Sequence, residues 1–553
     1  MDDFAASFAA ADRNPPYLED GEVHLPAELK KSLDAFYAGG WDKFSLPTEI
    51  GGGGAPPSLH WAVAEMLVGA NPAAYFYVIG TSMARVIDRV GTEEQRQRFC
   101  RPMLERNWGG SMVLTESEAG SDVGAGTTKA IHVEDDVYHL DGVKRFITSG
   151  DSDYFENIIH LVLARPEGGA PGTKGLSMFI VPKYLVNDDG SPGERNGIIT
   201  TNLEDKMGIK GSATCELTLG ADQPCVGYLV GGVHEGIRQM FLVIADARML
   251  IGVKSASTLS TAYLNALEYA AERVQGPDLT QGHDPEAPRV PILRHPNVRR
   301  LLMMQKAHAE GLRALALYTA SMQDRAALQP DEPYWERLSE LLLPLVKGYS
   351  SEKAYLLLAQ SLQVFGGSGF TKDYPIEQYI RDAKIDTVYE GTTGIQALDL
   401  LFRKIAKDQG ATLLRLAGQI TETVKGGEGD DPLQAERVLL GNALEDLQGQ
   451  LGVMGGHLMG AIADPPEVYL AGLHANALLE GLAEVLIGWL LIQHAEISLQ
   501  AMTEADEDDR SFYQGKVASA RWFAKTVLPR AALRRSLAEA ETGMLMELPD
   551  AAF

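Results

Sequence analysis

One carboxylate stands where this sequence is about to begin a helix. Glu390 lies between Tyr389 and Gly391 in DTVYEGTTGIQALDLLFRKI, residues 386–405, and a helix is predicted to begin around 392–393. A carboxylate at such a place often only complements the helix dipole and the free N–H groups of the first turn. The other hypothesis is a positioned base that takes a proton from a ligand, with Gly391 allowing a close approach. This stretch alone favours the first hypothesis and leaves the second open.

A second stretch, VLTESEAGSDVGAG at 113–126, gathers hydroxyl groups and small residues after the core of a predicted strand. Thr115, Gly120, Ser121 and Gly124 would place backbone N–H groups and hydroxyls where an anion could bind. An ordinary Ser/Gly turn explains the same residues equally well. The stretch is not a P-loop, because the GxxxxGK[ST] spacing and its lysine are both missing.

The third stretch is FITSG at 146–150. We expect it to end the second strand of a hairpin whose turn is Asp141–Gly142, because Asp-Gly is the strongest short hairpin signal. Phe146 and Thr148 would then lie on one face of that strand, where the ring could cover a planar ligand and the hydroxyl could bond its edge. An ordinary β-pair is the default alternative.

The elements that must position these residues run from helices to β-structure and back to helices, which predicts an α+β fold. Residues 1–110 are expected to be helical, and 111–232 to form a small β domain. Residues 233–405 are expected to form a helical bundle that carries Glu390, and 406–553 an additional helical domain. The predicted apolar stripe of the helix after Glu390 consists of Leu398, Leu401, Phe402 and Ile405.

Composition is that of an ordinary globular protein, with 45% hydrophobic and 22% charged residues. The 553 residues are enough for about three or four domains. The formal net charge of -26 argues against a nucleic-acid partner and against docking on anionic lipid. The simpler interpretation is that the negative charge only keeps the protein soluble.

The cellular setting is predicted from three further features. Cys100, Cys215 and Cys225 form no CxxC pair, so no disulfide framework or metal site is expected and a reducing cytoplasm fits. The acidic start MDDFAASFAA lacks the basic region of a signal peptide. The most apolar run, 477–495, contains two glutamates and is predicted to be a buried core helix and not a membrane span.

Four motifs in this order resemble those of the acyl-CoA dehydrogenase family. They are TESEAGSD in a first strand, FITSG in the predicted hairpin, GGSGF after a helix, and RDAKIDTVYEGTTGIQ before another. The resemblance covers about residues 25–405, and four ordered motifs are together highly specific. Residues 406–553 resemble the extra helical domain of a longer subgroup, which includes mycobacterial long-chain enzymes and methylmercaptopropionyl-CoA dehydrogenases. FYQGKVASARWFAKTVLP at 512–529 carries that likeness.

The resemblance implies a helical–β–helical fold that binds FAD and an acyl thioester. Glu390 then resembles the base that removes the α-proton while a hydride leaves the β-carbon for the flavin. A solvated carboxylate of pKa about 4 is too weak a base for this proton, so we expect burial to raise its basicity. With the other motifs present, the base hypothesis becomes the preferred one.

The cofactor contacts are implied by the same motifs. Thr115 and Thr148 are similar to the residues that hydrogen-bond the flavin, and Phe146 occupies the position of the family's usual tryptophan against the ring. Ser121, with Gly120 beside it, lies where the family contacts the cofactor's phosphate or the substrate.

Other contacts are implied across a subunit interface. Arg273 resembles the arginine that meets the FAD pyrophosphate of the neighbouring subunit, and Gln363 and Gly367 resemble that neighbour's adenine-side contacts. Thr392 resembles a second adenosine-side contact, and Arg248 an arginine near the thioester. The residues assigned to the substrate are Ser121, Arg248, Tyr389 and Gly391.

We therefore expect a cytoplasmic FAD-dependent acyl-CoA dehydrogenase that forms a 2,3-enoyl-CoA and passes electrons to an electron-transferring flavoprotein. Shared sites imply a homodimer or a dimer of dimers. One rival is a flavin oxidase or desaturase of the same fold, acting on a carrier-protein thioester or another activated substrate. A second rival is a helical scaffold without catalysis. The motifs do not report the length or branching of the acyl chain.

Four features depart from the family's pattern. Gly394 stands where a polar residue is common, and Pro296 follows His295 in place of a frequent glutamine. The loop 276–291 is longer than in simple members. Only 114 residues precede Thr115, which suggests a misassigned start or a trimmed pocket.

Overall fold

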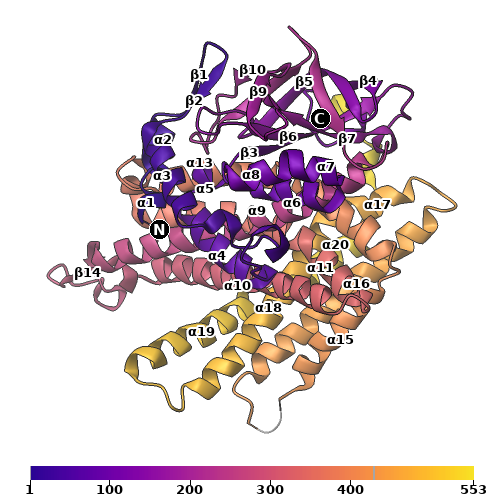
Figure 1. The fold of residues 1–553 in the computed structure, drawn as a ribbon. Coiled ribbons are helices and arrows are strands. Elements are labelled where there is room, and N and C mark those ends of the chain that lie inside the picture. The colour runs from indigo at the N-terminus through magenta and orange to yellow at the C-terminus, as the bar shows by residue number, and fades with distance from the viewer. Residues whose placement is uncertain (1, 428–429) are drawn as a thin grey trace. The chain divides into compact units, whose positions relative to one another are not determined.

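The computed structural model describes residues 2–427 and 430–553. The chain divides into two compact units, residues 1–247 and 248–553. Figure 1 follows the chain through both units by colour. The order of helices, β-structure and helices confirms the predicted α+β fold. The four domain boundaries stay a prediction.

The first unit begins with a helical part that contains one hairpin. Its helices are α1 (Asp2–Ala5), α2 (Phe8–Arg13), α3 (Ala27–Ala38), α4 (Pro57–Ala70), α5 (Pro72–Tyr75), α6 (Gly80–Val90), α7 (Glu93–Gln95) and α8 (Arg101–Glu105). Strands β1 (Tyr17–Glu19) and β2 (Glu22–His24) interrupt them. Thr92 and Gln95 form a reciprocal capping box at the start of α7.

An eight-stranded sheet follows. Its strands are β3 (Gly109–Val113), β4 (Lys129–Glu134), β5 (Val137–Thr148), β6 (Ile158–Pro166), β7 (Ser177–Pro182), β10 (Ile198–Leu203), β11 (Thr214–Leu219) and β12 (Cys225–Leu229). The order is β10-β11-β5-β12-β7-β6-β3, with β4 paired to β5 and β6. Strands β8 (Tyr184–Val186) and β9 (Pro192–Arg195) form a separate pair. Figure 1 shows α6 and α8 beside this sheet, and their buried Met83, Ile87 and Met103 share one core with Leu161 and Met178 of the strands.

The predicted hairpin at Asp141–Gly142 is wrong, because β5 runs through these residues as one twelve-residue strand. Its first half pairs with β12 and its second half with β11. Gly142 is required for space: a Cβ there would lie 2.9 Å from the Cα of Thr128. The Asp-Gly hairpin of this protein is instead Asp20–Gly21, between β1 and β2, where both residues have positive φ, 51° and 79°.

The second unit is helical apart from one short hairpin. Helix α9 (Gly236–Glu272) leads into it, and strands β13 (Val274–Pro277) and β14 (Arg289–Pro291) follow. The further helices are α10 (Pro296–Leu328), α11 (Pro333–Pro344), α12 (Ser350–Phe365), α13 (Ile376–Lys384), α14 (Thr393–Leu398), α15 (Ala411–Lys425), α16 (Gln434–Gly460), α17 (Glu467–Leu473), α18 (Ala475–Ala501), α19 (Glu507–Thr526), α20 (Arg530–Glu539) and α21 (Met544–Glu547). Pro296 occupies the first position of α10, where its missing N–H costs nothing.

Two stretches of this unit are wound as π-helix, η8 (Leu345–Tyr349) and η11 (Asp399–Ala406). The wider turn of η11 changes which residues face inward. Leu401 and Ile405 are buried as predicted, whereas Leu398 and Phe402 are 39% and 37% exposed. The predicted apolar stripe is therefore confirmed for Leu401 and Ile405 and wrong for Leu398 and Phe402.

Helix α18 is long and apolar enough to span a membrane, but 83% of its most apolar window is buried in the protein. Helices α10, α14, α16 and α19 pack around it. This confirms the prediction of a buried core helix for the run at 477–495. The three cysteines are free and buried.

Candidate functional site

Glu390 is held in a conformation that few non-glycine residues adopt. Its φ is +56°, in the left-handed region, and that of Gly391 is +91°. A left-handed glutamate costs free energy, so the surrounding structure must hold it there. Glu390 as a whole is partly buried. Thr392 caps the helix that follows, since its Oγ1 accepts the Ile395 N–H at 3.4 Å. The helix start predicted at 392–393 is confirmed.

Three side chains hold the backbone of the Glu390 loop, which we define as residues 387–392. Gln396 Nε2 donates to the carbonyl of Glu390 at 2.9 Å, and Arg248 Nε donates to the same oxygen at 3.4 Å. Lys347 Nζ donates to the carbonyl of Gly391 at 2.6 Å. Lys347 and Gln396 are fully buried. Side chains that donate hydrogen bonds to its carbonyl groups thus hold the left-handed turn in place.

Burial raises the pKa of Glu390 to about 7, although nearby Arg248 and Lys347 oppose the rise. Arg248 is itself buried and paired, with its Nη1 2.9 Å from Asp399 Oδ2. Burial lowers the pKa of Lys347 to about 8, against the pull of Asp386 and Glu390. A carboxyl group with a pKa near 7 is suited to accept a proton at neutral pH.

A buried ion pair fixes the residues just before Glu390. Lys254 Nζ lies 2.7 Å from Asp386 Oδ1 and donates to the carbonyl of Asp382 at 3.0 Å. The Tyr389 hydroxyl donates to Asp386 Oδ1 at 2.7 Å. The hydrogen bond from Tyr389 to Asp386 therefore helps to orient the Glu390 loop.

In the first unit, the loop after β3 is folded around Glu116. The carboxylate accepts four hydrogen bonds, from the N–H and hydroxyl groups of Thr127 and Thr128. Lys144 Nζ on β5 lies 3.0 Å from Glu116 Oε1 and donates to the carbonyl of Leu114 at 2.9 Å. Half-buried Thr115 lies between these anchors, while Gly120 and Ser121 are exposed on the same loop.

Phe146 and Thr148 follow on β5, which bulges where it pairs with β11. Phe146 has a φ of +62° and its side chain is 53% exposed. Ile147 between the two residues is buried, whereas Phe146 is exposed and Thr148 is partly buried. The Arg145 N–H donates to the carbonyl of Thr115 at 2.9 Å, which joins this strand to the loop.

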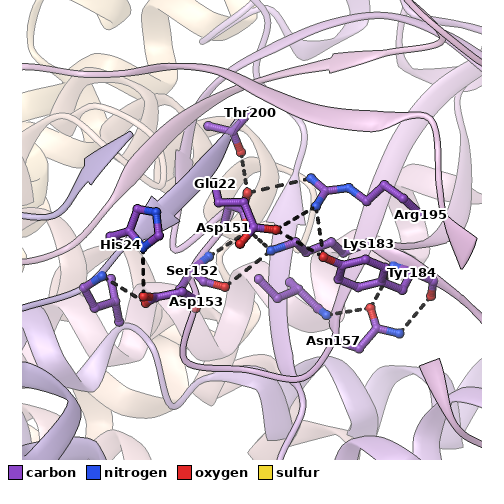
Figure 2. Close-up of polar contacts among 12 residues, drawn as sticks. Glu22, His24, Asp151, Ser152, Asp153, Asn157, Lys183, Tyr184, Arg195 and Thr200 are labelled. Atoms are coloured by element: carbon purple, nitrogen blue, oxygen red, sulfur yellow. Dashed lines mark hydrogen bonds and ion pairs between the residues drawn. The ribbon is translucent and has the colours of Figure 1, made fainter. Parts of the chain in front are cut away.

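A polar network fixes the end of that strand. Figure 2 shows Asp151 between Lys183 and Thr200: Lys183 Nζ lies 2.6 Å from Asp151 Oδ1, and Thr200 Oγ1 donates to Oδ2 at 2.9 Å. Two residues on, Asp153 accepts hydrogen bonds from Lys30 and from the N–H of Leu25. The strand that carries Thr148 is thus tied to β10, α3 and the first hairpin.

Arg273, Gln363 and Gly367 lie exposed on the second unit. Tyr269 near the end of α9 packs against Phe365 at the end of α12, with ring centroids 4.7 Å apart and the rings tilted by 35°, so the two helix ends are neighbours. Within the described part of the chain, no ion pair holds the Arg273 side chain, and pairing with Glu268 or Glu272 does not occur.

The structure thus brings Glu390, Arg248, Tyr389, Gly391 and Thr392 together in one unit. In the other unit, Thr115, Phe146 and Thr148 share one region. Sequence analysis missed the anchoring residues, which are Glu116, Lys144, Lys254, Lys347, Asp386 and Gln396. The one available signal was a charged residue inside an apolar run, as in PLVKGY. Among residues 2–427 and 430–553, no group of His, Cys, Asp or Glu is arranged to hold a metal ion.

Four domain models match nearly the whole chain. They describe the acyl-CoA dehydrogenase N-terminal domain (residues 2–107), middle domain (111–221) and C-terminal domain (234–404), and an acetyl-CoA dehydrogenase C-terminal-like domain (416–549).

Relatives of similar length match as well. The chain is 52% identical to the broad-specificity linear acyl-CoA dehydrogenase of Mycobacterium tuberculosis, over 99% of this chain and 91% of that protein. It is 36% identical to 3-methylmercaptopropionyl-CoA dehydrogenase of Ruegeria pomeroyi, over 92% and 85%. An acyl-CoA dehydrogenase of Bacillus anthracis, solved in complex with FAD, has the same fold: the TM-score is 0.74 at 22% identity, covering 94% and 84%.

The Glu116 anchor predicts a specific dependence of stability on pH. Burial alone would raise the pKa of this carboxyl group, but Lys144 and the threonine donors outweigh it and lower the pKa to about 2 from 4.5. A depressed pKa adds stability above pH 4.5, and this contribution is lost as the pH falls through about 2. We expect Glu116→Gln to cost about 3 kcal/mol at pH 7, and less as the pH falls from 4.5.

Urea unfolding of both proteins at pH 7, 4 and 3 measures this difference in the free energy of unfolding. Glu118→Gln, an exposed change in the same loop, is the control and should cost little at each pH. A Glu116→Gln penalty that stays constant from pH 7 to 3 would contradict the assignment.

Proposed function

Because the chain belongs to the acyl-CoA dehydrogenase family, we propose that it converts an acyl-CoA thioester to the 2,3-enoyl-CoA, with Glu390 as the base. The carboxylate takes the proton from the α-carbon, and the β-carbon loses a hydride. The two electrons left by the α-proton form the new double bond. FAD, when bound, supplies the acceptor for the hydride.

The observation that carries this proposal is the state of Glu390. It combines a strained backbone with φ of +56° and a pKa raised to about 7. A carboxylate that only complemented the dipole of α14 would need neither. Strain and a shifted pKa occur together where a group is positioned to react.

The backbone beside Glu390 suits the charge that develops on the thioester oxygen. Among the hydrogen bonds of the described residues, none is donated by the N–H of Glu390. An N–H group aimed at that oxygen would stabilise the enolate-like charge. The Arg248 and Lys347 cations near the loop favour negative charge there as well.

The residues present fit FAD. Phe146 has a strained backbone and an exposed flat ring, with the Arg145 guanidinium 4.9 Å from the ring centroid, and Thr148 follows it on β5. Thr115 and Ser121 add hydroxyl groups on the neighbouring loop. The unpaired Arg273 is suited to a pyrophosphate, since its planar fork binds phosphate oxygens in pairs. At Gly366 and Gly367 a Cβ would meet no atom within 4 Å, so the chain leaves room there.

We extend the proposal to the substrate and the partners. The named activity of the mycobacterial relative supports linear acyl-CoA substrates. An electron-transferring flavoprotein in the cytoplasm would accept the electrons, and two chains would share each site, with Arg273, Gln363 and Gly367 serving the neighbour.

Anaerobic mixing of the purified flavoprotein with a panel of acyl-CoAs tests this function. We expect the flavin absorbance to bleach with linear acyl-CoAs and to recover when an electron-transferring flavoprotein is added. Rapid release of peroxide in air would indicate an oxidase instead. Colourless protein that cannot take up FAD would indicate a scaffold and contradict the proposal.

We predict that Glu390→Gln keeps FAD and thioester binding but loses roughly 10²–10⁴-fold in the rate of flavin bleaching. The amide fills the same space but cannot accept the α-proton. In the wild-type protein, kcat/KM should rise with pH through about 7, because the base must be deprotonated. If Glu390→Gln retains half the activity, Glu390 is not the base.

We predict that Phe146→Ala weakens FAD retention more than folding. The ring is half exposed and sits on a β-bulge, so truncation leaves no core cavity, whereas loss of a core phenylalanine would cost about 3–5 kcal/mol. Thermal unfolding and the dissociation constant for FAD measure the two effects. If the variant instead unfolds at a lower temperature but binds FAD normally when folded, a role of Phe146 in FAD binding is excluded.

Mixed subunits test whether sites are shared. We predict that mixing inactive Glu390→Gln chains with inactive Arg273→Ala chains restores activity once the subunits exchange. In a mixed dimer with shared sites, one site carries both lesions and the other carries neither. If both residues serve the site of their own chain, every site keeps one lesion. A mixed dimer as inactive as its parents would therefore exclude sharing.

A further inference from the structure

A buried cluster of charges lies where the helices after residue 406 meet α12 and η8. Glu484 of α18 is 2% exposed, and Arg534 Nη1 of α20 lies 2.7 Å from its Oε2. The Tyr349 hydroxyl donates to Glu484 Oε1 at 3.3 Å, and Lys353 Nζ is 3.7 Å from the same atom. Arg534 Nη2 also reaches Glu480 at 3.0 Å.

Stability alone does not explain this cluster. Replacing buried ion pairs by apolar side chains is often neutral or stabilising, because desolvation offsets the attraction. The rest of α18 is packed with leucine, isoleucine and valine, so an apolar residue would fit its surroundings. What the charges add is a fixed position for the groups that contact them, above all Tyr349.

Tyr349 is the last residue of η8, the π-helical turn that also contains Lys347. Single π-turns inside helices are frequent at functional sites. Lys347 Nζ holds the carbonyl of Gly391 at 2.6 Å. This one turn thus contacts α18 through Tyr349 and the Glu390 loop through Lys347.

A second contact runs alongside the first. A Cβ at Gly348 would lie 3.1 Å from Leu479 of α18 and 3.3 Å from the Cβ of Gln396. Helix α18, η8 and α14 therefore meet at this glycine. Gln396 in turn holds the carbonyl of Glu390.

We propose that Tyr349 and Glu484 are positioning residues for Glu390, so that the helices after residue 406 set the geometry of the base through η8. The inference rests on the proposed role of Glu390 as the base. It assigns this added part of the chain a place in the reaction instead of a separate activity.

The sign of a pH shift distinguishes this mechanism from a direct electrostatic effect. The charged and titratable groups around Glu390 and Lys347 are Arg248, Glu352, Asp386 and Tyr389. Lys347 lowers the pKa of Glu390, so a loosened Lys347 would let that pKa rise. Glu484→Gln removes a negative charge, which acting through space would instead lower it.

The test uses Tyr349→Phe and Glu484→Gln in the full-length flavoprotein. Because a misplacement of about 1 Å can cost on the order of 10²-fold, we expect flavin bleaching to slow at least about 10-fold. The acid limb of its pH profile should move to higher pH in both variants. Amide hydrogen exchange in residues 388–396 should accelerate in both, whether or not a substrate is present.

Two matched variants serve as controls. Glu496→Gln changes a glutamate on the same helix that pairs with Arg437, and Tyr334→Phe removes a buried hydroxyl without a hydrogen-bond partner. Both should keep the wild-type profile and the wild-type exchange of 388–396.

Two results would overturn the inference. One is a lower melting temperature in Tyr349→Phe and Glu484→Gln with an unchanged acid limb and unchanged exchange. The other is an acid limb that moves to lower pH in Glu484→Gln. If Glu484→Gln does not fold, the milder Tyr349→Phe decides. If no acyl-CoA bleaches the flavin of the wild-type protein, the proposed function is refuted. The hydrogen-exchange measurement would still show whether the Tyr349–Glu484 contact orders residues 388–396.

Discussion

A buried ammonium group must find partners, since leaving one unpaired in the protein interior costs several kcal/mol. Lys144, Lys254 and Lys347 are all fully buried. Each donates to a backbone carbonyl of its own unit, namely those of Leu114, Asp382 and Gly391. Two of them also meet a buried carboxylate. These lysines fix the path of the backbone more firmly than apolar packing would, because a shifted carbonyl would leave a charge unpaired.

This constraint accounts for the strain at the site. Phe146 and Glu390 both have positive φ. Phe146 follows Lys144 closely on β5, and Glu390 directly precedes Gly391, whose carbonyl Lys347 holds. A strained residue persists only where its neighbours over-determine its conformation. The same anchors leave both side chains partly exposed, the Phe146 ring at 53%. Buried charges therefore fix the backbone here, while the side chains of Phe146 and Glu390 stay partly exposed.

Local chemistry is what the sequence could predict. The helix start at 392–393 and the core helix at 477–495 depend on a few adjacent residues, and both are confirmed. Asp141–Gly142 failed because the dipeptide does not reveal whether glycine provides a turn or only space for a neighbouring strand. That neighbour, Thr128, is known only once β4 and β5 are paired. The domain boundaries and the roles of the site residues remain predictions.

The contacts around Glu390 and η8 lie at the other extreme of sequence separation. Arg248 reaches Glu390 across 142 residues, Lys347 reaches Gly391 across 44, and Tyr349 reaches Glu484 across 135. No periodicity or short motif encodes such pairs, because each partner alone is an ordinary charged or aromatic residue. A motif can therefore show which carboxylate resembles a base. Whether its pKa and backbone suit that task depends on residues of α9, η8 and α14, and in our proposal on the helices after residue 406 as well.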